Sequence, residues 1–537
     1  MSVDYDYPLI IKHILETGVN YAPKQEIVYR DLRRSSYSDL YERVCRLANS
    51  LEELGVKKGT RVGVLEWDSN RYLECYFAIP MLGAVLHTVN IRLSPDDIKY
   101  TINHAEDEVL LLNSEFLPIV ESLKGELETV KKFVIMTDED MPETDLTDLE
   151  YEKMLRNASK KYEFPDLDEK EMATLFYTSG TTGRPKGVWY SHRQLFLHTL
   201  ASAVWLTGWR SSLRLKGDKE VYMPLTPMFH VHSWGYPYVA TLLGLKQVYP
   251  GRYEPKKIIK LILNEGVSFS HCVPTVLQMI LDNLPPGLNL NGWKVIVGGS
   301  KLPLKLAIRA KERGITTITG YGMSETCPNV LYASLKPHML DLPEEKKLEY
   351  AVKTGIPYPL VYVRAIHEDF SDVKKDEKDM GEIVVRAPWL TKGYLKDQAK
   401  TEELWAGGWL HTGDLAVVGE EGYFTVVDRL KDVIKSGGEW ISSLALENLI
   451  GMHPKVKEVA VVGIPDEKWG ERPIAIVVPV PGQELKVEEI REHLMKFVEQ
   501  GVITRYAVPE RYEFVAEIPK TSVGKLDKKL LRQKYRG

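Results

Sequence analysis

The most informative segment of the sequence is Tyr177-Thr178-Ser179-Gly180-Thr181-Thr182-Gly183-Arg184-Pro185-Lys186-Gly187. Its glycines let the backbone adopt positive φ angles and bring N–H groups close to an anion. Four hydroxyl side chains add hydrogen-bond donors, and the lysine adds a point charge of the kind that phosphate loops use. The residues predicted to bind phosphate are Thr178, Ser179, Gly180, Thr181, Thr182, Gly183 and Lys186.

The flanking sequence predicts a strand before this loop and a helix after it. Met172–Tyr177 is an apolar run, and apolar residues recur at helical spacing from Ser191 to Thr207. The loop differs from a Walker A motif, which requires Gly before the lysine and Ser or Thr after it. A plain surface turn is the alternative, but the number of hydroxyls, glycines and the trailing lysine favours a phosphate loop.

Composition is that of a globular protein with two or three domains: 537 residues, 44% apolar and 27% charged. The net charge of −5 gives no overall basic field, so nucleic acid is not an expected partner. Four scattered cysteines without a CxxC pair suit a reducing compartment and predict a cytoplasmic protein. No apolar run approaches the roughly 18 residues of a membrane span, so no integral membrane segment is expected.

Strand and helix patterns alternate along the first part of the chain and predict an α/β fold. Arg61–Trp67, Ala84–Val89 and Lys294–Val297 have strand patterns. We expect a large N-terminal domain of doubly wound mixed sheets over residues 1–427. An acidic stretch, 138–149, is predicted to be a surface connection within it. Residues 432–537 predict a smaller, mobile C-terminal α+β domain, with residues 428–431 as the hinge.

Four further segments follow in order: Gly320-Tyr321-Gly322-Met323-Ser324-Glu325-Thr326, Trp409-Leu410-His411-Thr412-Gly413-Asp414-Leu415, Asp428-Arg429-Leu430-Lys431-Asp432-Val433-Ile434-Lys435 and Pro519-Lys520-Thr521-Ser522-Val523-Gly524-Lys525. Each alone is weak, since short Gly-Asp or terminal Lys patterns are common in turns and solvated tails. Together with the phosphate loop they resemble the adenylate-forming superfamily of acyl-CoA synthetases, adenylation domains and luciferases.

The resemblance implies a role for each motif. Tyr321 would stack on adenine, Glu325 would hold Mg²⁺ with Thr178, and Asp414 would bind ribose. Lys525 would be the catalytic lysine, and Lys431 the pivot of the hinge. The remaining residues assigned in this way are Gly299, Ser300, Gly320, Gly322, Ser324, Arg429 and Trp440 for the nucleotide and CoA, and Lys435 for catalysis. For Arg429 the alternative is a salt bridge between domains.

The segment Pro227–Trp234 is similar to that of bacterial and archaeal medium- and long-chain fatty acyl-CoA synthetases. By this likeness His230 would flank the acyl site and act in catalysis, and Trp234 would gate the acyl tunnel beside Gly298. The alternatives are a core histidine that has its hydrogen-bond partners and an ordinary core tryptophan.

The function implied is an AMP-forming acyl-CoA synthetase that uses ATP, Mg²⁺ and coenzyme A. It would activate a carboxylic acid, in the first place a medium- or long-chain fatty acid, to an acyl-adenylate, and transfer the acyl group to CoA. A ligase for short, hydroxy or thio acids, an amino-acid adenylating enzyme and a non-catalytic nucleotide-binding protein are the alternatives. A homodimer is one assembly that the resemblance allows.

Overall fold

The computed structural model describes residues 7–178, 184–208, 213–217, 219–437, 439–520 and 526–536. Contacts divide the chain into two compact units. Unit 1 comprises residues 1–363 and 385–410, and unit 2 comprises residues 364–384 and 411–537. The predicted hinge at 428–431 falls inside unit 2, and its role as a hinge stays a prediction.

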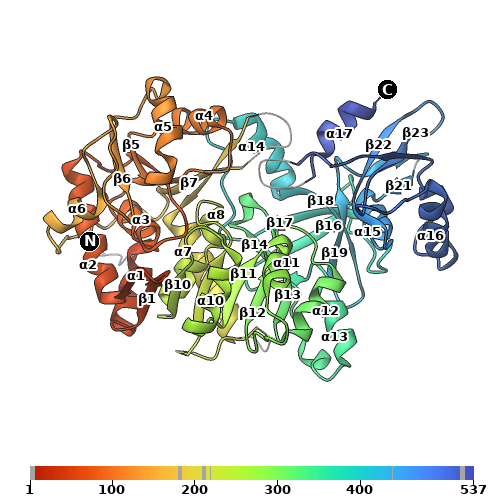
Figure 1. The fold of residues 1–537 in the computed structure, drawn as a ribbon, viewed down its shortest axis with the longest axis horizontal. Helices are drawn as coiled ribbons and strands as arrows, with labels where there is room; N and C mark the ends of the chain where they lie inside the picture. Colours follow the sequence, from red (N-terminus) through yellow and green to blue (C-terminus); the bar gives the residue numbers. More distant parts are fainter. Residues whose placement is uncertain are drawn as a thin grey trace, which may run out of the picture. The chain divides into compact units, whose positions relative to one another are not determined.

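The first sheet of unit 1 has six strands, and its five parallel strands are joined by helices (Figure 1). In spatial order they are β6 (Lys132–Met136), β5 (Val109–Asn113), β3 (Arg61–Leu65), β4 (Val85–Thr88), β7 (Met172–Thr178) and the antiparallel β8 (Lys186–Ser191). Four of the strands, β3, β4, β5 and β6, are buried along most of their length on both faces, which is typical of parallel sheets covered by helices.

The second sheet of unit 1 has nine strands: β15 (Ile356–Pro357), β14 (Asn329–Tyr332), β13 (Thr316–Gly322), β12 (Lys294–Val297), β11 (Phe269–Cys272), β9 (Val221–Leu225), β10 (Lys246–Tyr249), β1 (Glu26–Tyr29) and β2 (Arg33–Ser36). The strands from β13 to β1 are parallel, while β2, β14 and β15 are antiparallel to their neighbours. Both sheets are therefore mixed, as predicted.

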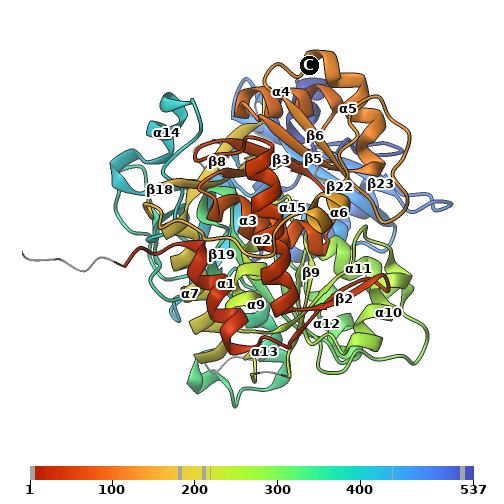
Figure 2. The ribbon, with the colours of Figure 1, turned by 90° about the vertical axis from the view of Figure 1, so that its left-hand side faces the viewer.

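Several helices of unit 1, among them α3, α7 and α12, pack on these sheets, and α1, α2 and α3 pack against one another (Figure 2). They are α1 (Ile11–Tyr21), α2 (Tyr37–Glu53), α3 (Asn70–Met81), α4 (Pro95–Ala105), α5 (Leu117–Leu123), α6 (Tyr151–Asn157), α7 (His192–Gly208), α8 (Val231–Trp234), α9 (Tyr236–Leu242), α10 (Pro255–Glu265), α11 (Pro274–Asn283), α12 (Leu304–Glu312), α13 (Glu344–Ala351) and α14 (Gln398–Leu404). None of the helices in the described part of the chain is both long and apolar enough to span a membrane.

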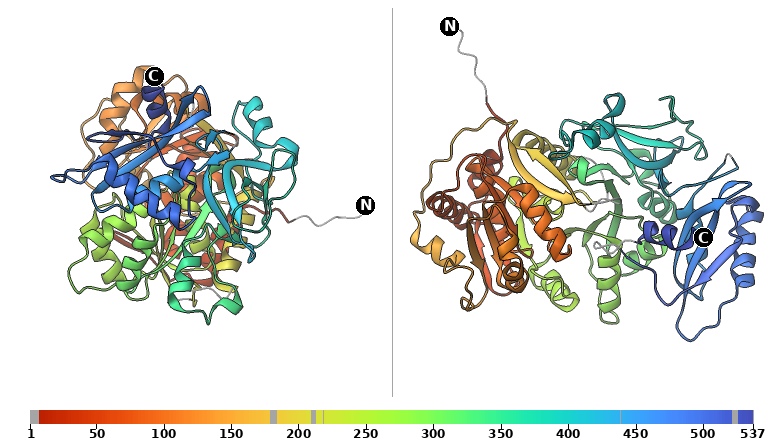
Figure 3. Two further views of the ribbon diagram at one scale, coloured as in Figure 1. Left: turned by 90° about the vertical axis from the view of Figure 1, so that its right-hand side faces the viewer. Right: turned by 90° about the horizontal axis from the view of Figure 1, so that it is seen from above.

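Unit 2 contains two further sheets, and most of its strands are blue in Figure 3. One has the order β16 (Tyr362–Ile366), β17 (Gly381–Arg386), β18 (Leu410–Val418), β19 (Phe424–Arg429); the other has β21 (Glu439–Ile441), β20 (Ile434–Ser436), β23 (Gly470–Pro479), β22 (Val456–Asp466), with β24 (Arg511–Phe514) on β23. The smaller α+β domain is confirmed, but unit 2 also takes in residues 364–384 and 411–431, which the sequence assigned to the large domain and the hinge.

Alternation along β22 explains how the second sheet of unit 2 is covered on both faces. Val459 and Val461 face a core with α15 (Ser443–Gly451) and α16 (Val487–Glu499). Ala460 and Val462 point the other way, into a core with α17 (Lys528–Tyr535). Successive side chains of a strand point to opposite faces, so an uninterrupted apolar run predicts this double burial.

Candidate active site

The predicted phosphate loop closes an antiparallel hairpin. Thr178, the last residue of β7, lies opposite Lys186, the first residue of β8. The prediction that the loop leads directly into a helix was wrong, because residues 186–191 form a strand with Val188 and Tyr190 buried before α7 begins. The other predicted phosphate residues, Ser179, Gly180, Thr181, Thr182 and Gly183, lie outside the described residues.

Tyr394 joins the loop lysine to the metal-motif glutamate within unit 1. Its hydroxyl donates to Glu325 Oε1 over 2.6 Å, and the Lys186 ammonium lies 4.6 Å from its ring centroid. Burial, and next the charge of Glu325, raise the pKa of Tyr394 well above its ordinary value, so the hydroxyl keeps its proton and donates. Two motifs far apart in sequence are thereby brought to one aromatic ring.

Sequence reasoning missed Tyr394. It follows Thr391-Lys392-Gly393 and belongs to none of the five motifs. The one available signal was an aromatic hydroxyl directly after a glycine, which is common in turns. Glu325 itself is 6% exposed and sits in the short turn Ser324–Thr326. Burial of this carboxylate, with Tyr394 as a donor, agrees with a binding role.

The adenine motif lies at the carboxyl end of β13, where parallel α/β sheets bind their ligands. A Cβ on Gly322 would lie 1.6 Å from the carbonyl oxygen of Pro328, so only glycine fits. Gly298 follows the neighbouring strand β12, and a Cβ there would lie 2.6 Å from the Gly320 carbonyl oxygen and 2.9 Å from Trp234 Cη2. The predicted residues Gly298, Gly320 and Trp234 therefore lie next to one another. Gly299 and Ser300 follow Gly298 in an exposed turn. Tyr321 lies in β13, between the two glycines of the adenine motif.

Residues 231–235 form a left-handed turn directly after His230. The φ angles are 48° at Val231, 54° at His232, 49° at Ser233, 57° at Trp234 and 74° at Gly235. A left-handed conformation costs roughly 1–2 kcal/mol for each non-glycine residue. Such strain persists only where the surroundings over-determine the conformation, and it clusters at ligand sites.

The surroundings of this turn contain neutral histidines. Burial lowers the pKa values of His198, His232 and His271 to about 3. His271 is held by hydrogen bonds of 2.8 Å with Tyr222 and with Thr226, and its ring centroid lies 5.1 Å from that of Trp234. Trp234 is 4% exposed and packs between this neutral ring and Gly298.

In unit 2, Asp414 and Arg429 lie opposite each other on β18 and β19, with Nε 3.1 Å from Oδ1. Asp414 is buried, whereas the Arg429 side chain is 45% exposed. A pocket of about 310 Å³ adjoins them, lined by Thr412, Gly413, Arg429, Leu430 and Lys431. Partial burial, and next the charge of Arg429, lower the pKa of Lys431 to about 8. The ion pair of Arg429 with Asp414 lies within unit 2.

The two predicted catalytic lysines, Lys435 and Lys525, differ in what the structure describes. Lys435 is exposed on β20 opposite Trp440 of β21, and its ammonium lies 5.5 Å from the indole centroid. Lys525 lies outside the described residues. Each unit thus carries its own part of the predicted site.

Comparison with known proteins identifies the family. A family model described as AMP-binding enzyme matches residues 15–395, and one described as AMP-binding enzyme C-terminal domain matches residues 445–525. A long-chain-fatty-acid–CoA ligase of Thermus thermophilus is 44% identical over 100% of this chain and 97% of its own length. A 3-methylmercaptopropionyl-CoA ligase of Ruegeria lacuscaerulensis is 35% identical over 98% of each chain.

Among solved structures, that of the anthranilate CoA ligase AuaEII in complex with anthranoyl-AMP matches with a TM-score of 0.84 and 25% identity over 98% of both chains. The resemblance drawn from the five motifs and the predicted fold class are both confirmed. The chain belongs to the AMP-binding enzyme family.

Proposed function

We propose that this chain is an AMP-forming acyl-CoA ligase that activates a medium- or long-chain fatty acid with ATP and passes the acyl group to CoA. The observation that carries the proposal is the 44% identity, over the whole chain, to a ligase for long-chain fatty acids. The contacts of Glu325 and Lys186 with Tyr394 support it, because a carboxylate and the lysine of the phosphate hairpin both contact one tyrosine.

The proposed chemistry has two steps. A carboxylate oxygen attacks the α-phosphorus of ATP, forming a P–O bond and releasing pyrophosphate. The CoA thiol then attacks the acyl carbonyl, gives up its proton, and releases AMP. The first step brings like charges together, so fixed cations matter: each one about 4 Å away contributes roughly 4 kcal/mol at an effective dielectric near 20. Lys186 would bind the β- and γ-phosphates, and Lys525 would bridge the carboxylate and α-phosphate.

Mg²⁺ fits the donor set at Glu325. Within the described residues no group of three metal-ligating side chains is present, so a metal cage built by the protein alone is not found there. Mg²⁺ is commonly bound by one or two carboxylates plus substrate phosphates. Glu325 would supply one such carboxylate, and Thr178, which lies opposite Lys186 in the hairpin, would supply a hydroxyl oxygen. When bound, the ion would neutralise phosphate charge.

Unit 2 would supply the ribose and pivot functions. Asp414 would accept hydrogen bonds from the ribose hydroxyls, beside Arg429. Lys431 would be the pivot between the two steps, and Lys435 and Trp440 would act in thioester formation. The exposure of Lys435 and Arg429 agrees with groups that change partners during the reaction.

A panel of carboxylic acids tests the proposal with the full-length protein. Pyrophosphate release that requires ATP, Mg²⁺ and a fatty acid, followed by CoA-dependent thioester formation, is the expected result. Preference for a thio acid would instead favour the activity named for the Ruegeria relative. No pyrophosphate release with any acid would refute the proposal. A homodimer and a cytoplasmic location are proposed on the family likeness, and light scattering and cell fractionation test them.

A further inference from the structure

The acyl segment, residues 226–235, is anchored by side chains from the other sheet of unit 1. The N–H of Met228 donates to Asp68 Oδ1 over 2.8 Å. The carbonyl of Met228 accepts from the Tyr76 hydroxyl, and the carbonyl of Phe229 accepts from Thr88 Oγ1 over 2.9 Å. Three backbone groups of Met228 and Phe229 are therefore hydrogen-bonded to side chains from the loop between β3 and α3, from α3 and from β4.

Asp68 is the acidic member of this clamp and uses both carboxyl oxygens, and burial raises its pKa to about 7. Oδ2 accepts from the Tyr253 hydroxyl over 2.7 Å, while its backbone carbonyl accepts from the N–H of Gly251 over 2.9 Å. Asp68 is 2% exposed. A buried carboxylate is tolerated only when it is hydrogen-bonded, and here both partners belong to the nine-stranded sheet and the turns that follow its strands.

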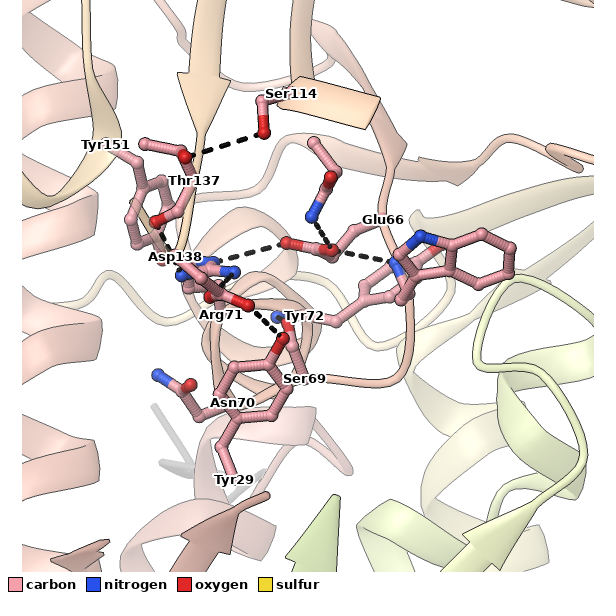
Figure 4. A network of polar contacts seen from close by, with 12 residues as sticks. Tyr29, Glu66, Ser69, Asn70, Arg71, Tyr72, Ser114, Thr137, Asp138 and Tyr151 are labelled. Atoms are coloured by element: carbon pink, nitrogen blue, oxygen red, sulfur yellow. Dashed lines mark hydrogen bonds and ion pairs between the residues drawn. The ribbon is translucent and has the colours of Figure 1, made fainter. Parts of the chain in front are cut away.

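The loop that carries Asp68 is itself fixed on both sides (Figure 4). Glu66 and Asp138 lie on either side of the Arg71 guanidinium, at 3.2 and 2.7 Å. Ser69 caps α3 by accepting from the N–H of Tyr72. Asp138, the first residue of the predicted surface connection, is thus an ion-pair partner rather than a solvated acid. Asp68 has little freedom to move with respect to β3.

We propose that Asp68 is a positioning residue for the acid substrate: through the N–H of Met228 it fixes His230 and Trp234 relative to the sheet that carries the phosphate hairpin. The six-stranded sheet holds β7 and β8, and the nine-stranded sheet holds the acyl segment. In-line attack requires the carboxylate and the phosphate to be held within a fraction of an ångström, and the clamp is a direct link between their supports. This inference rests on the proposed function.

The test uses the full-length Asp68→Ala and Asp68→Asn variants, with Tyr37→Phe as a matched control. Tyr37 is fully buried in unit 1 and its hydroxyl donates to the Leu245 carbonyl over 2.6 Å, so this variant removes a buried hydrogen bond that involves neither Asp68 nor residues 226–235. Acid-dependent pyrophosphate release is measured with saturated acids of about six to sixteen carbons. We expect Asp68→Ala to raise KM for the acid about tenfold, since the buried hydrogen bond from the N–H of Met228 is lost, and to flatten the chain-length profile.

KM for ATP should stay within about twofold, and Asp68→Asn, which keeps an oxygen acceptor, should lie within about threefold of the parent. Equal loss of kcat in Asp68→Ala and Tyr37→Phe, with unchanged KM values, would overturn the inference. Thr88→Val, which removes the bond to Phe229, takes the place of Asp68→Ala should that variant not fold.

Amide hydrogen exchange gives a second readout that does not depend on activity. Peptides covering 226–235 should exchange faster in Asp68→Ala than in the parent or in Tyr37→Phe, and unchanged exchange would overturn the inference. An inactive parent protein with faster exchange in Asp68→Ala would refute the proposed function and leave the clamp standing.

Discussion

The acyl segment of unit 1 and the turn at 429–431 of unit 2 hold their site residues in opposite ways. The acyl segment is buried, adopts a strained left-handed turn and is bonded by side chains far away in sequence. The turn in unit 2 carries an Arg429 side chain that is 45% exposed and a Lys431 that adjoins an open pocket. The acyl segment is therefore held in one conformation, whereas the side chains of the turn at 429–431 are exposed and less constrained.

This difference suggests that the two regions serve different steps of the reaction. A chain-length filter must keep one shape through both steps, so burial and many bonds suit it. Groups needed in one step only must change partners, and exposed cations on a small unit suit that role. Variants in the acyl segment should therefore affect both half-reactions alike, and variants at Lys525 and Lys431 of unit 2 should separate them.

The largest effect is expected for Lys525→Ala. Adenylation should fall at least about a hundredfold, because a cation aimed at the transition state typically contributes several kcal/mol. Thioester formation from supplied acyl-AMP should fall much less. Lys529→Ala, an exposed lysine on α17, is the control and should leave both steps unchanged. Equal loss of both half-reactions would contradict separate roles.

Lys431→Pro should show the opposite bias. Proline fixes φ near −65° and would obstruct rotation about that bond, so thioester formation should slow at least about tenfold while acyl-AMP still forms. Lys431→Ala keeps the backbone rotation and is the matched control. Stopped-flow measurement of the second step checks this, and unchanged thioester formation in the proline variant would remove Lys431 from the hinge.

A smaller effect is expected for Trp234→Ala, which should favour longer acids over shorter ones in kcat/KM. Each methylene discriminated by an apolar pocket contributes about 1–3 kcal/mol or less, so shifts near tenfold are expected. Trp293→Ala is the control, because Trp293 is a buried residue of the core around β12. Its truncation should cost about 3–5 kcal/mol of stability and lower activity on every acid equally. The same uniform loss in Trp234→Ala would refute the gate.

The smallest effect concerns acid stability. Burial lowers the pKa of His232 to about 3, with the charges of His198 and His230 adding to the shift. The unfolded chain therefore binds a proton at this site below about pH 6.5 while the folded chain does not, so stability falls as the pH drops from 6.5 towards 3. Asn at position 232 tolerates the left-handed φ, and His232→Asn should make the unfolding free energy fall less steeply with acid, by at most about 1.4 kcal/mol per pH unit. Tm should then fall less steeply with acid as well. Parallel Tm curves would contradict this.

The sequence predicted the local elements better than the long-range contacts. Most strands and the family motifs follow from residue patterns confined to ten or twenty positions. The left-handed turn does not, since only Gly235 in it favours positive φ and the bond from Met228 reaches Asp68, 160 residues earlier. Tyr394 was missed for the same reason: its partners, Glu325 and Lys186, are distant in sequence. The prediction of a helix directly after the phosphate loop was wrong, because residues 186–191 form a short strand that runs directly into α7.

Oxygen labelling tests the central claim of carboxylate adenylation most directly. The acid is supplied with both carboxylate oxygens as ¹⁸O, together with ATP, Mg²⁺ and CoA, and the products are read by mass spectrometry. Attack on the α-phosphorus leaves one acid oxygen on the nucleotide when the thioester forms, so we predict one ¹⁸O in AMP and none in pyrophosphate. ¹⁸O in inorganic phosphate, with ADP as the nucleotide product, would contradict the account.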